Sequence, residues 1–253
     1  MLKKKLTKNE LSLGSWLMMG NSTNAEVMSQ VGFDWIAIDL EHTSIDLETT
    51  KNLIQIIQSK SVKALVRVSK NDEVIIKRVL DMGADGIIVP MICSKEDAIK
   101  AVSYSKYPPS GKRGVGLYRA SEYGLNFQQY KKWVDEELVI IAQIEHVDGV
   151  KNIDNIIDTN GIDGILIGPY DLSASMGSPG NFEESKFKNA VEQIIEKCKK
   201  KNISVGFHVV DTDPKEIQNK IQQGCNFLAY GIDYMFMREA AINGLKEIKK
   251  NSK

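Results

Sequence analysis

Two acidic residues, Glu145 and Asp171, stand at or just beyond the ends of two apolar runs of the chain. Glu145 closes the run Val139–Glu145, and Asp171 follows the run Gly164–Pro169. Carboxylates with no Cys and no paired His suit a hard divalent cation such as Mg²⁺ or Mn²⁺. Two protein ligands also leave open positions for water and a chelating substrate, as in a Lewis-acid site. The alternative is that both acids form salt bridges or helix caps, with Asp171 capping a helix that starts at Leu172.

Arg67 and His42 are the candidates for charge stabilisation and for proton transfer. Arg67 lies near the end of an apolar run, where an inward guanidinium would present its planar fork to a carboxylate or a developing oxyanion. His42 follows another run, and an imidazole titrates near neutral pH, which suits a general base. The alternatives are an Arg67 that pairs structurally with an acid of the fold and a His42 that is a satisfied strand-end histidine.

Two further features bear on the chemistry. The segment Gly168–Ser173 could form an anion cradle from backbone N–H groups at the start of a helix. A Schiff-base aldolase needs a desolvated lysine in its pocket, but Lys63 and Lys70 flank their apolar run and neither lies inside it. The residues therefore favour metal chemistry over lysine chemistry.

The elements that must position these residues alternate along the chain. Eight short β-rich apolar runs predict strands, and amphipathic segments between them predict helices. Continuous apolar runs are typical of buried parallel strands, so the pattern indicates an α/β fold. The predicted strands are Leu13–Met19, Trp35–Glu41, Ala64–Ser69, Gly86–Ile92, Val139–Glu145, Gly164–Pro169, Val205–Val210 and Phe227–Asp233. The predicted helices include Asp46–Ser61, Asp72–Met82, Lys95–Tyr107, Asp148–Thr159, Glu183–Asn202 and Pro214–Gln223.

A short repeat favours a closed TIM (β/α)₈ barrel over an open sheet. Gly-x-Asp or Gly-x-Asn precedes every second predicted strand, at Gly32, Gly83, Gly161 and Gly224. Each Gly can take the left-handed conformation that ends a helix, and the Asp or Asn can turn the chain into the next strand. Active sites of such barrels lie at the C-terminal ends of the strands. The candidates above fall there, as do the three histidines (His42, His146 and His208) and Asp233.

Length, charge and cysteine content limit the number of domains, the expected partners and the expected compartment. We expect one domain over residues 1–253, because barrels commonly run to about 250 residues. Lys plus Arg and Asp plus Glu both number 33, so neither nucleic acid nor an anionic membrane is an expected partner. The three cysteines form no CxxC pair, and Lys3–Lys5 is not followed by an apolar segment, which together favour a cytoplasmic protein. The long irregular segment Pro108–Tyr130 is expected to be functional or mobile.

Several motifs occur together and in order. The chain resembles the HpcH/HpaI aldolase family, the metal-dependent class II pyruvate aldolases, from about Gly14 to Met237. The resemblance implies a TIM barrel, in agreement with the strand count. The motifs are Asp39-Leu40-Glu41-His42, Arg67, Val79-Leu80-Asp81-Met82-Gly83-Ala84, Val89-Pro90-Met91, Tyr107-Pro108-Pro109 with Arg113-Gly114-Val115-Gly116, Gln143-Ile144-Glu145, and Ile167-Gly168-Pro169-Tyr170-Asp171-Leu172-Ser173-Ala174-Ser175-Met176-Gly177.

The resemblance also implies a role for each site residue. Glu145 and Asp171 would hold a divalent metal (Mg²⁺, Mn²⁺ or Co²⁺), and Arg67 would stabilise the enolate oxygen. His42 would be the base, made more basic by Asp81. The pyruvyl part of the substrate would be bound by Gln143 and by the backbone at Tyr170 and Asp171. Two positions depart from the family pattern: Leu40 replaces a common Gly, and Tyr170 replaces a smaller residue and could narrow the pocket.

Asp81 and His42 are predicted at opposite ends of one barrel. Asp81 lies near the C-terminal end of a predicted helix of about ten residues, which rises roughly 15 Å away from the strand ends. The pair is therefore expected across a subunit contact, which makes oligomerisation part of the chemistry. The resemblance implies a homo-oligomer, a hexamer or a trimer, with the C-terminal helix exchanged between subunits.

The predicted activity is the reversible cleavage of a 4-hydroxy-2-oxo acid into pyruvate and an aldehyde. The base is expected to take the 4-hydroxyl proton, directly or through a metal-bound water, and the C3–C4 bond breaks. One alternative is a lyase or mutase that handles phosphoenolpyruvate or pyruvate, which would need a basic cluster beyond Lys112 and Arg113. Another is a small-molecule-binding barrel that has lost turnover. The sequence does not identify the aldehyde.

Overall fold

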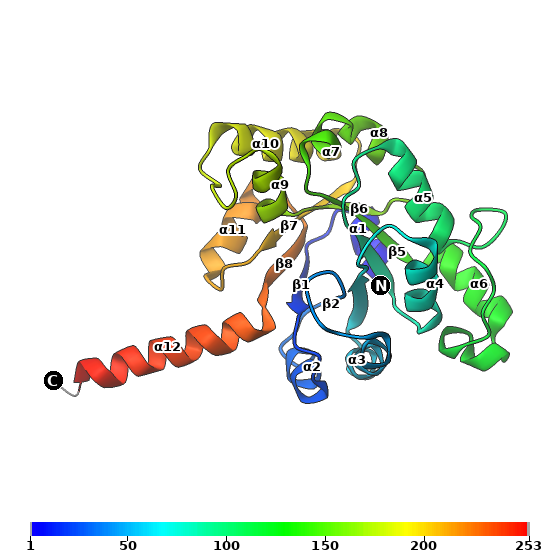
Figure 1. The fold of residues 1–253 in the computed structure, drawn as a ribbon, viewed down its shortest axis with the longest axis horizontal. Helices are drawn as coiled ribbons and strands as arrows, with labels where there is room; N and C mark the ends of the chain where they lie inside the picture. The colour runs from blue at the N-terminus through cyan, green and yellow to red at the C-terminus, as the bar shows by residue number, and fades with distance from the viewer. Residues whose placement is uncertain (1, 252–253) are drawn as a thin grey trace.

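The computed structural model describes residues 2–251, and within them eight parallel strands close into a barrel in the order β1 to β8 (Figure 1). Each strand pairs in parallel with its neighbours, and β8 pairs with β1. The predicted TIM barrel is confirmed. The strands are β1 (Ser12–Leu17), β2 (Trp35–Asp39), β3 (Lys63–Arg67), β4 (Gly86–Val89), β5 (Val139–Ile144), β6 (Gly164–Ile167), β7 (Ser204–Val209) and β8 (Phe227–Ile232).

Helices cover the outside of the barrel. The predicted helix over residues 148–159 is two short helices instead, α7 and α8. The structure also has helices that the six predicted segments do not include, namely α1, α2, α6, α9 and α12. The α-helices are α1 (Leu2–Thr7), α2 (Ser22–Met28), α3 (Leu47–Ser59), α4 (Glu73–Asp81), α5 (Lys95–Ser105), α6 (Phe127–Glu136), α7 (Val147–Lys151), α8 (Ile153–Ile157), α9 (Pro169–Ser175), α10 (Ser185–Lys200), α11 (Pro214–Gln223) and α12 (Asp233–Asn251). The segment between α5 and α6 also forms the 3₁₀ helix η1 (Arg119–Gly124).

The barrel interior is filled by side chains from alternate strand positions. Near its N-terminal end Trp35 and Phe227 stack with ring centroids 4.4 Å apart, and α1 adds the buried Leu6. A Cβ on Gly14 would lie 2.1 Å from the Trp35 ring, so this large residue requires glycine beside it. Toward the C-terminal end, the inward positions of the odd strands carry Trp16, Arg67, Gln143 and His208.

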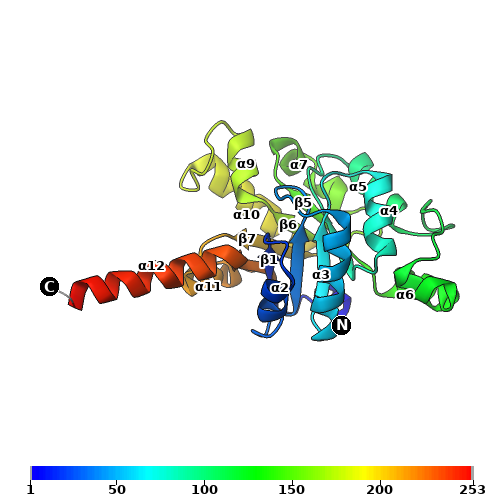
Figure 2. The same ribbon diagram turned by 60° about the horizontal axis from the view of Figure 1, so that its bottom comes forward.

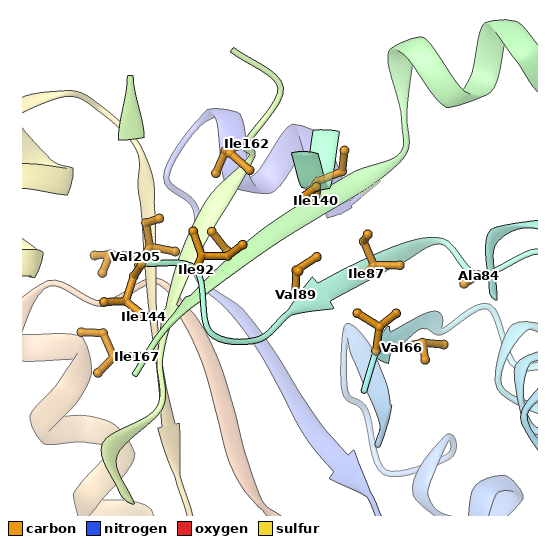
Figure 3. Close-up of a cluster of buried hydrophobic side chains, with 14 of the residues drawn as sticks. Val66, Ala84, Ile87, Val89, Ile92, Ile140, Ile144, Ile162, Ile167 and Val205 are labelled. Carbon is orange, nitrogen blue, oxygen red and sulfur yellow. The ribbon is translucent and has the colours of Figure 1, made fainter. Parts of the chain in front are cut away.

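The outward faces of the strands form the main hydrophobic core with the helices. Figure 3 shows part of this cluster, in which Val66, Val89 and Ile140 project from neighbouring strands. Branched aliphatic side chains dominate it, and most are fully buried. The apolar content of the eight runs is therefore explained by burial on both faces of each strand.

The Gly-x-Asp or Gly-x-Asn repeat precedes β2, β4, β6 and β8 and connects the start of each of these strands to the strand before it. Gly32, Gly83, Gly161 and Gly224 all have φ between 95° and 101°, as the repeat predicted. The acidic or amide side chain two residues later accepts a hydrogen bond from a backbone N–H of the preceding strand. The four pairs are Leu13 to Asp34 (3.0 Å), Ala64 to Asp85 (3.0 Å), Ile140 to Asp163 (2.9 Å) and Val205 to Asn226 (3.1 Å).

The last helix, α12, leaves the barrel and extends away from it (Figures 1 and 2). Large apolar side chains on it are exposed, including Met237 at 63% and Leu245 at 55%. Its first turn is anchored to β1, because buried Asp233 accepts hydrogen bonds from the N–H groups of Met18 and Met19. No helix within residues 2–251 combines the length and the apolar character needed to cross a membrane.

Candidate active site

Glu145 is the buried acid of the site. It follows β5 directly and is 2% exposed. Its Oε1 accepts a hydrogen bond of 2.7 Å from the backbone N–H of Met91, and its Oε2 accepts one from the side-chain amide of Gln143. Two strands and their loops therefore hold this carboxylate in one orientation.

Gly168, at the end of β6, makes room for Glu145. A Cβ on Gly168 would lie 2.8 Å from Glu145 Oε2 and 3.4 Å from Gln143 Nε2. The helix α9 then begins at Pro169, so Asp171 is its third residue and is exposed. The alternative in which Asp171 caps a helix beginning at Leu172 is therefore wrong. The N–H groups of Tyr170 and Asp171 are in the first turn, where no carbonyl of the helix can accept from them.

Three carboxylates repel one another at this end of the barrel. Burial raises the pKa of Glu145 to about 7, and the charges of Glu41 and Asp171 raise it further against the hydrogen bonds from Gln143 and Met91. Burial likewise raises the pKa of Glu41 to about 7, with Arg67 opposing the shift and Asp39 and Asp171 adding to it. Within residues 2–251, no basic side chain forms an ion pair with Glu145 or Asp171. The alternative in which Glu145 and Asp171 form salt bridges is therefore wrong for the described residues.

This acid set fits a divalent cation. All the donors are carboxylate oxygens, and a bound cation would relieve their mutual repulsion. In the described part of the chain, no group of three or more His, Cys, Asp and Glu side chains is arranged to enclose a metal ion. Glu145 and Asp171 would therefore be a two-residue set that leaves coordination positions open.

Arg67 forms a two-point ion pair with Asp39, which is fully buried. Its Nε donates to Asp39 Oδ1 at 2.8 Å and its Nη2 donates to Oδ2 at 2.7 Å. Burial alone would raise the pKa of Asp39, but the hydrogen bonds and charge of Arg67 hold that pKa below its usual range. The guanidinium also lies 4.4 Å from the centre of the Trp16 ring. The structural alternative for Arg67 is thus partly correct, but among residues 2–251 nothing accepts a hydrogen bond from its Nη1.

Glu41 links Arg67 to His42. Its Oε2 lies 3.4 Å from Arg67 Nε and 3.7 Å from His42 Nε2, and it accepts no hydrogen bond from the described residues. The His42 side chain is 55% exposed. Glu41 was assigned no role from the sequence, although the signal was available: it is a third acid at the C-terminal end of a predicted strand.

The other polar residues at strand ends divide into two groups. His208 belongs to the floor of the site: its ring lies 5.1 Å from that of Trp16, and burial lowers its pKa to about 3. His146 and Asp233 serve local structure instead. His146 caps α7 by accepting from the N–H of Asp148, and Asp233 ties α12 to β1. Tyr170 is 51% exposed and its ring packs edge-on against Phe182 at 5.1 Å.

Asp81 does not meet His42 within this chain. It is the last residue of α4, and its Oδ1 accepts a hydrogen bond of 2.5 Å from Arg113 Nη2. This agrees with the expectation that the two residues cannot touch within one barrel. Asp81 borders an outer cavity of about 390 Å³ that also involves Leu47 and Tyr118.

The site thus combines a TIM barrel with acids, an arginine and a histidine at the C-terminal ends of its strands. A family model described as HpcH/HpaI aldolase/citrate lyase matches residues 12–240. The chain belongs to the HpcH/HpaI aldolase/citrate lyase family. The family prediction made from the motifs is therefore confirmed.

Relatives in this family cover almost the whole chain. A 2-keto-3-deoxy-L-rhamnonate aldolase of Klebsiella pneumoniae is 34% identical over 252 residues, which are 99% of this chain and 93% of the relative. A protein of the same name from Salmonella paratyphi A is 34% identical over 98% of this chain and 92% of the relative. The predicted enzyme class, a carbon–carbon lyase with aldolase activity, is confirmed.

Solved structures of the HpcH/HpaI family have the same fold. A family protein of Burkholderia cenocepacia is 28% identical with a TM-score of 0.93, and the match covers 98% of both chains. An HpcH/HpaI aldolase of Desulfitobacterium hafniense is 29% identical with a TM-score of 0.89, covering 98% of this chain and 96% of that one. The barrel is therefore shared over almost the whole chain.

Proposed function

We propose that this aldolase uses a divalent metal to cleave a 4-hydroxy-2-oxo acid reversibly into pyruvate and an aldehyde. The observation that carries the proposal is Glu145, a buried carboxylate that lies among other acids and forms no ion pair within residues 2–251. A cation is the missing counter-charge for such a group. The substrate class named for the relatives, a 2-keto-3-deoxy sugar acid, is itself a 4-hydroxy-2-oxo acid.

The metal would be held by Glu145 and Asp171, and oxygen ligands suit Mg²⁺, Mn²⁺ or Co²⁺. When bound, the cation supplies Lewis acidity that polarises the substrate carbonyl and stabilises the enolate. Gln143 and the N–H groups of Tyr170 and Asp171 bind the pyruvyl carboxylate and carbonyl oxygens. Because only the backbone of Tyr170 is needed, its ring can remain against Phe182.

Arg67 and His42 perform the remaining steps. The Nη1 group of Arg67 donates a hydrogen bond to the enolate oxygen, while Nε and Nη2 stay bound to Asp39. His42 takes the proton of the 4-hydroxyl group as the C3–C4 bond breaks, and the electron pair of that bond goes into the enolate. Protonation of the enolate carbon then gives pyruvate.

The site is completed by a second copy of the chain. Asp81 of one subunit pairs with His42 of another and raises the basicity of that imidazole. The projecting helix α12 is the second contact, because its exposed Met237 and Leu245 require cover and another copy supplies it. Light scattering should give a hexamer or a trimer for the wild type, and Leu245→Asp should reduce the molar mass.

The two rival functions are less well supported. A phosphoenolpyruvate enzyme would use Lys112 and Arg113 for phosphate, but Lys112 lies 3.3 Å from Glu73 and Arg113 is buried against Asp81. A barrel that only binds small molecules has no use for an arginine held with one free donor beside three acids. The cytoplasmic location predicted from composition stays a prediction.

The test is an aldol assay with the purified protein. Pyruvate and a panel of aldehydes, including hydroxyaldehydes such as lactaldehyde, are incubated with Mg²⁺, Mn²⁺ or Co²⁺, and products are detected by mass spectrometry. We expect 4-hydroxy-2-oxo acids to form, to disappear with EDTA, and to return when metal is restored. A covalent lysine adduct trapped by borohydride in the presence of pyruvate would contradict the proposal. The panel also identifies the aldehyde that the enzyme prefers.

A further inference from the structure

The Asp81 carboxylate is held by one buried arginine. Arg113 has a fully buried side chain, with its guanidinium 4.8 Å from the ring centre of Tyr107 and 5.4 Å from that of Tyr130. Its Nη2 donates to Asp81 Oδ1 at 2.5 Å and to the Tyr130 hydroxyl at 3.1 Å. That hydroxyl in turn donates to the carbonyl of Leu80, the residue before Asp81. The guanidinium is therefore fixed relative to the end of α4.

Among residues 2–251, Asp81 is the one acid that forms an ion pair with Arg113. Within residues 2–251, its Nε and Nη1 have no hydrogen-bond partner, and it forms no second ion pair. A buried guanidinium with two unpaired donors is costly, and the contacts that offset this cost are the ion pair with Asp81 and the contacts with Tyr107 and Tyr130. Its one charged contact is the residue that the proposed reaction pairs with His42.

The second oxygen of Asp81 is kept clear by a glycine. A Cβ on Gly116 would lie 2.6 Å from Asp81 Oδ2, so a larger residue at that position would press on this oxygen. Asp81 also borders the outer cavity of about 390 Å³ described above. One oxygen is thus bound by Arg113, and the loop that carries Arg113 leaves space beside the other.

We propose that Arg113 is a positioning residue for the aldol reaction: it holds Asp81 ionised and in one orientation, so that Oδ2 meets His42 of a second subunit. The inference rests on the pairing of His42 and Asp81 in the proposed function. It makes the segment between α5 and α6 part of the reaction machinery, because that segment carries Arg113 and Gly116.

Electrostatics support this role. Burial raises the pKa of Asp81, and Arg113 and Lys77 oppose the shift. The other charged side chains at the same cavity are Glu48, Lys51 and Arg78, which lie on α3 and α4. Without Arg113 the carboxyl would bind a proton at higher pH, and a neutral carboxyl no longer favours the charged form of an imidazole.

The same segment offers a matched control. Arg119 donates to the carbonyl of Met82 at 2.8 Å and to Gln58 Oε1 at 2.9 Å. It therefore ties the segment to the same end of α4 without touching Asp81. If Arg113 only anchored the segment, Arg119→Met and Arg113→Met would have similar consequences.

The experiment is a double-mutant cycle on the full-length enzyme with metal. The variants are Arg113→Met, Asp81→Asn, the double variant and Arg119→Met, each measured for kcat/KM against pH, with melting temperature and molar mass as controls. Arg113→Met should lose about 10–100-fold in kcat/KM, the usual cost of removing a partner of a functional group. The acid limb of its kcat/KM profile should move to lower pH, as in Asp81→Asn. The double variant should lose no more kcat/KM than Asp81→Asn alone.

The outcomes separate the two proposals. Losses that multiply in the double variant, or an equal loss in Arg119→Met, would overturn the role of Arg113. If Asp81→Asn loses activity but Arg113→Met does not, only this inference fails. If Asp81→Asn keeps wild-type activity and pH dependence, the pairing with His42 fails, and the role of Arg113 fails with it. Should Arg113→Met fold poorly, Tyr130→Phe removes one bond to the same Nη2, and its smaller loss should also vanish in the Asp81→Asn background.

Discussion

Asp39 binds two of the three guanidinium nitrogens of Arg67, at 2.8 and 2.7 Å, and leaves Nη1 without an acceptor among residues 2–251. The pair spans β2 and β3, whose register places Asp39 directly beside Arg67. Because Asp39 is fully buried, the orientation of Arg67 is set before any substrate arrives. A donor fixed in this way needs no reorganisation when charge develops on an oxygen next to it.

Replacement of Arg67 should therefore reduce kcat more than it changes KM. Removal of one such donor costs about 3 kcal/mol, or about a hundredfold or more in rate. Arg67→Ala should also lower the free energy of unfolding, by about 3–5 kcal/mol, because Asp39 keeps a buried charge without a partner.

A second variant separates these two effects. Arg67→Met combined with Asp39→Asn removes the unpaired charge, so most of the stability should return while kcat remains low. Urea unfolding and steady-state kinetics measure the two quantities. Near-normal turnover in the double variant would mean that Arg67 is only structural.

The acids of the site predict an unusual pH dependence of stability. In the folded protein the pKa values of Glu145 and Glu41 are about 7, against 4.5 for an ordinary Glu. The folded state therefore binds more protons between these values, and these two groups lower stability as the pH rises from about 4.5 to 7. Added Mn²⁺ or Mg²⁺ should raise the melting temperature more at pH 8 than at pH 5.5, since protons compete with the metal.

Glu145→Gln is the control for this prediction. The variant removes one of the two titrating groups and a proposed metal ligand. Its melting temperature should depend less on pH, and the metal should stabilise it little at either pH. An equal metal-induced shift at both pH values in the wild type would contradict the assignment.

Gly168→Ala should weaken metal binding. The new Cβ would stand 2.8 Å from Glu145 Oε2 and 3.1 Å from Glu145 Cβ, so the carboxylate must move. We expect at least about a tenfold weaker metal affinity by calorimetry, as for other changes next to a ligand. Gly244→Ala is the control for metal affinity, since nothing within the chain lies within 4 Å of its added Cβ, and its molar mass is measured because α12 is a proposed subunit contact. Unchanged affinity in Gly168→Ala would place the metal elsewhere.

The pairing of His42 with Asp81 across subunits predicts complementation. His42→Ala and Asp81→Ala homo-oligomers should each be nearly inactive. After dissociation and joint reassembly, a fraction of the sites contains both wild-type residues, so activity should recover. Mixed oligomers no more active than either parent would leave His42 as an unassisted base. Asp81→Asn should in addition move the acid limb of kcat/KM to lower pH, because a carboxylate raises the pKa of a neighbouring imidazole.

The sequence predicted the parts of this molecule that follow from local patterns. Apolar runs identified all eight strands, and the repeat at Gly32 and its counterparts identified the starts of β2, β4, β6 and β8. The acids Glu145 and Asp171 were found because they follow such runs. Their chemistry follows from their residue type and from their place at the C-terminal ends of the parallel strands.

Contacts between residues that lie far apart in the sequence could not be predicted from the sequence. The bond between Arg113 and Asp81 joins residues 32 positions apart and has no periodic signal. Glu41 gains its importance from the nearness of Arg67 and Glu145, which only the closed barrel produces. The start of α9 at Pro169, and hence the position of Asp171 in the first turn, depends on a turn whose geometry the residue types leave open.

Metal-dependent enolisation of pyruvate tests the central claim most directly, because it needs no knowledge of the aldehyde. Pyruvate is incubated with the enzyme in D₂O, and loss of the methyl proton signal is followed by NMR. We predict exchange with Mg²⁺ or Mn²⁺, none above background with EDTA, and none in Glu145→Gln at any metal concentration that supports the wild type. Exchange that persists without metal, or that Glu145→Gln retains in full, would contradict the account.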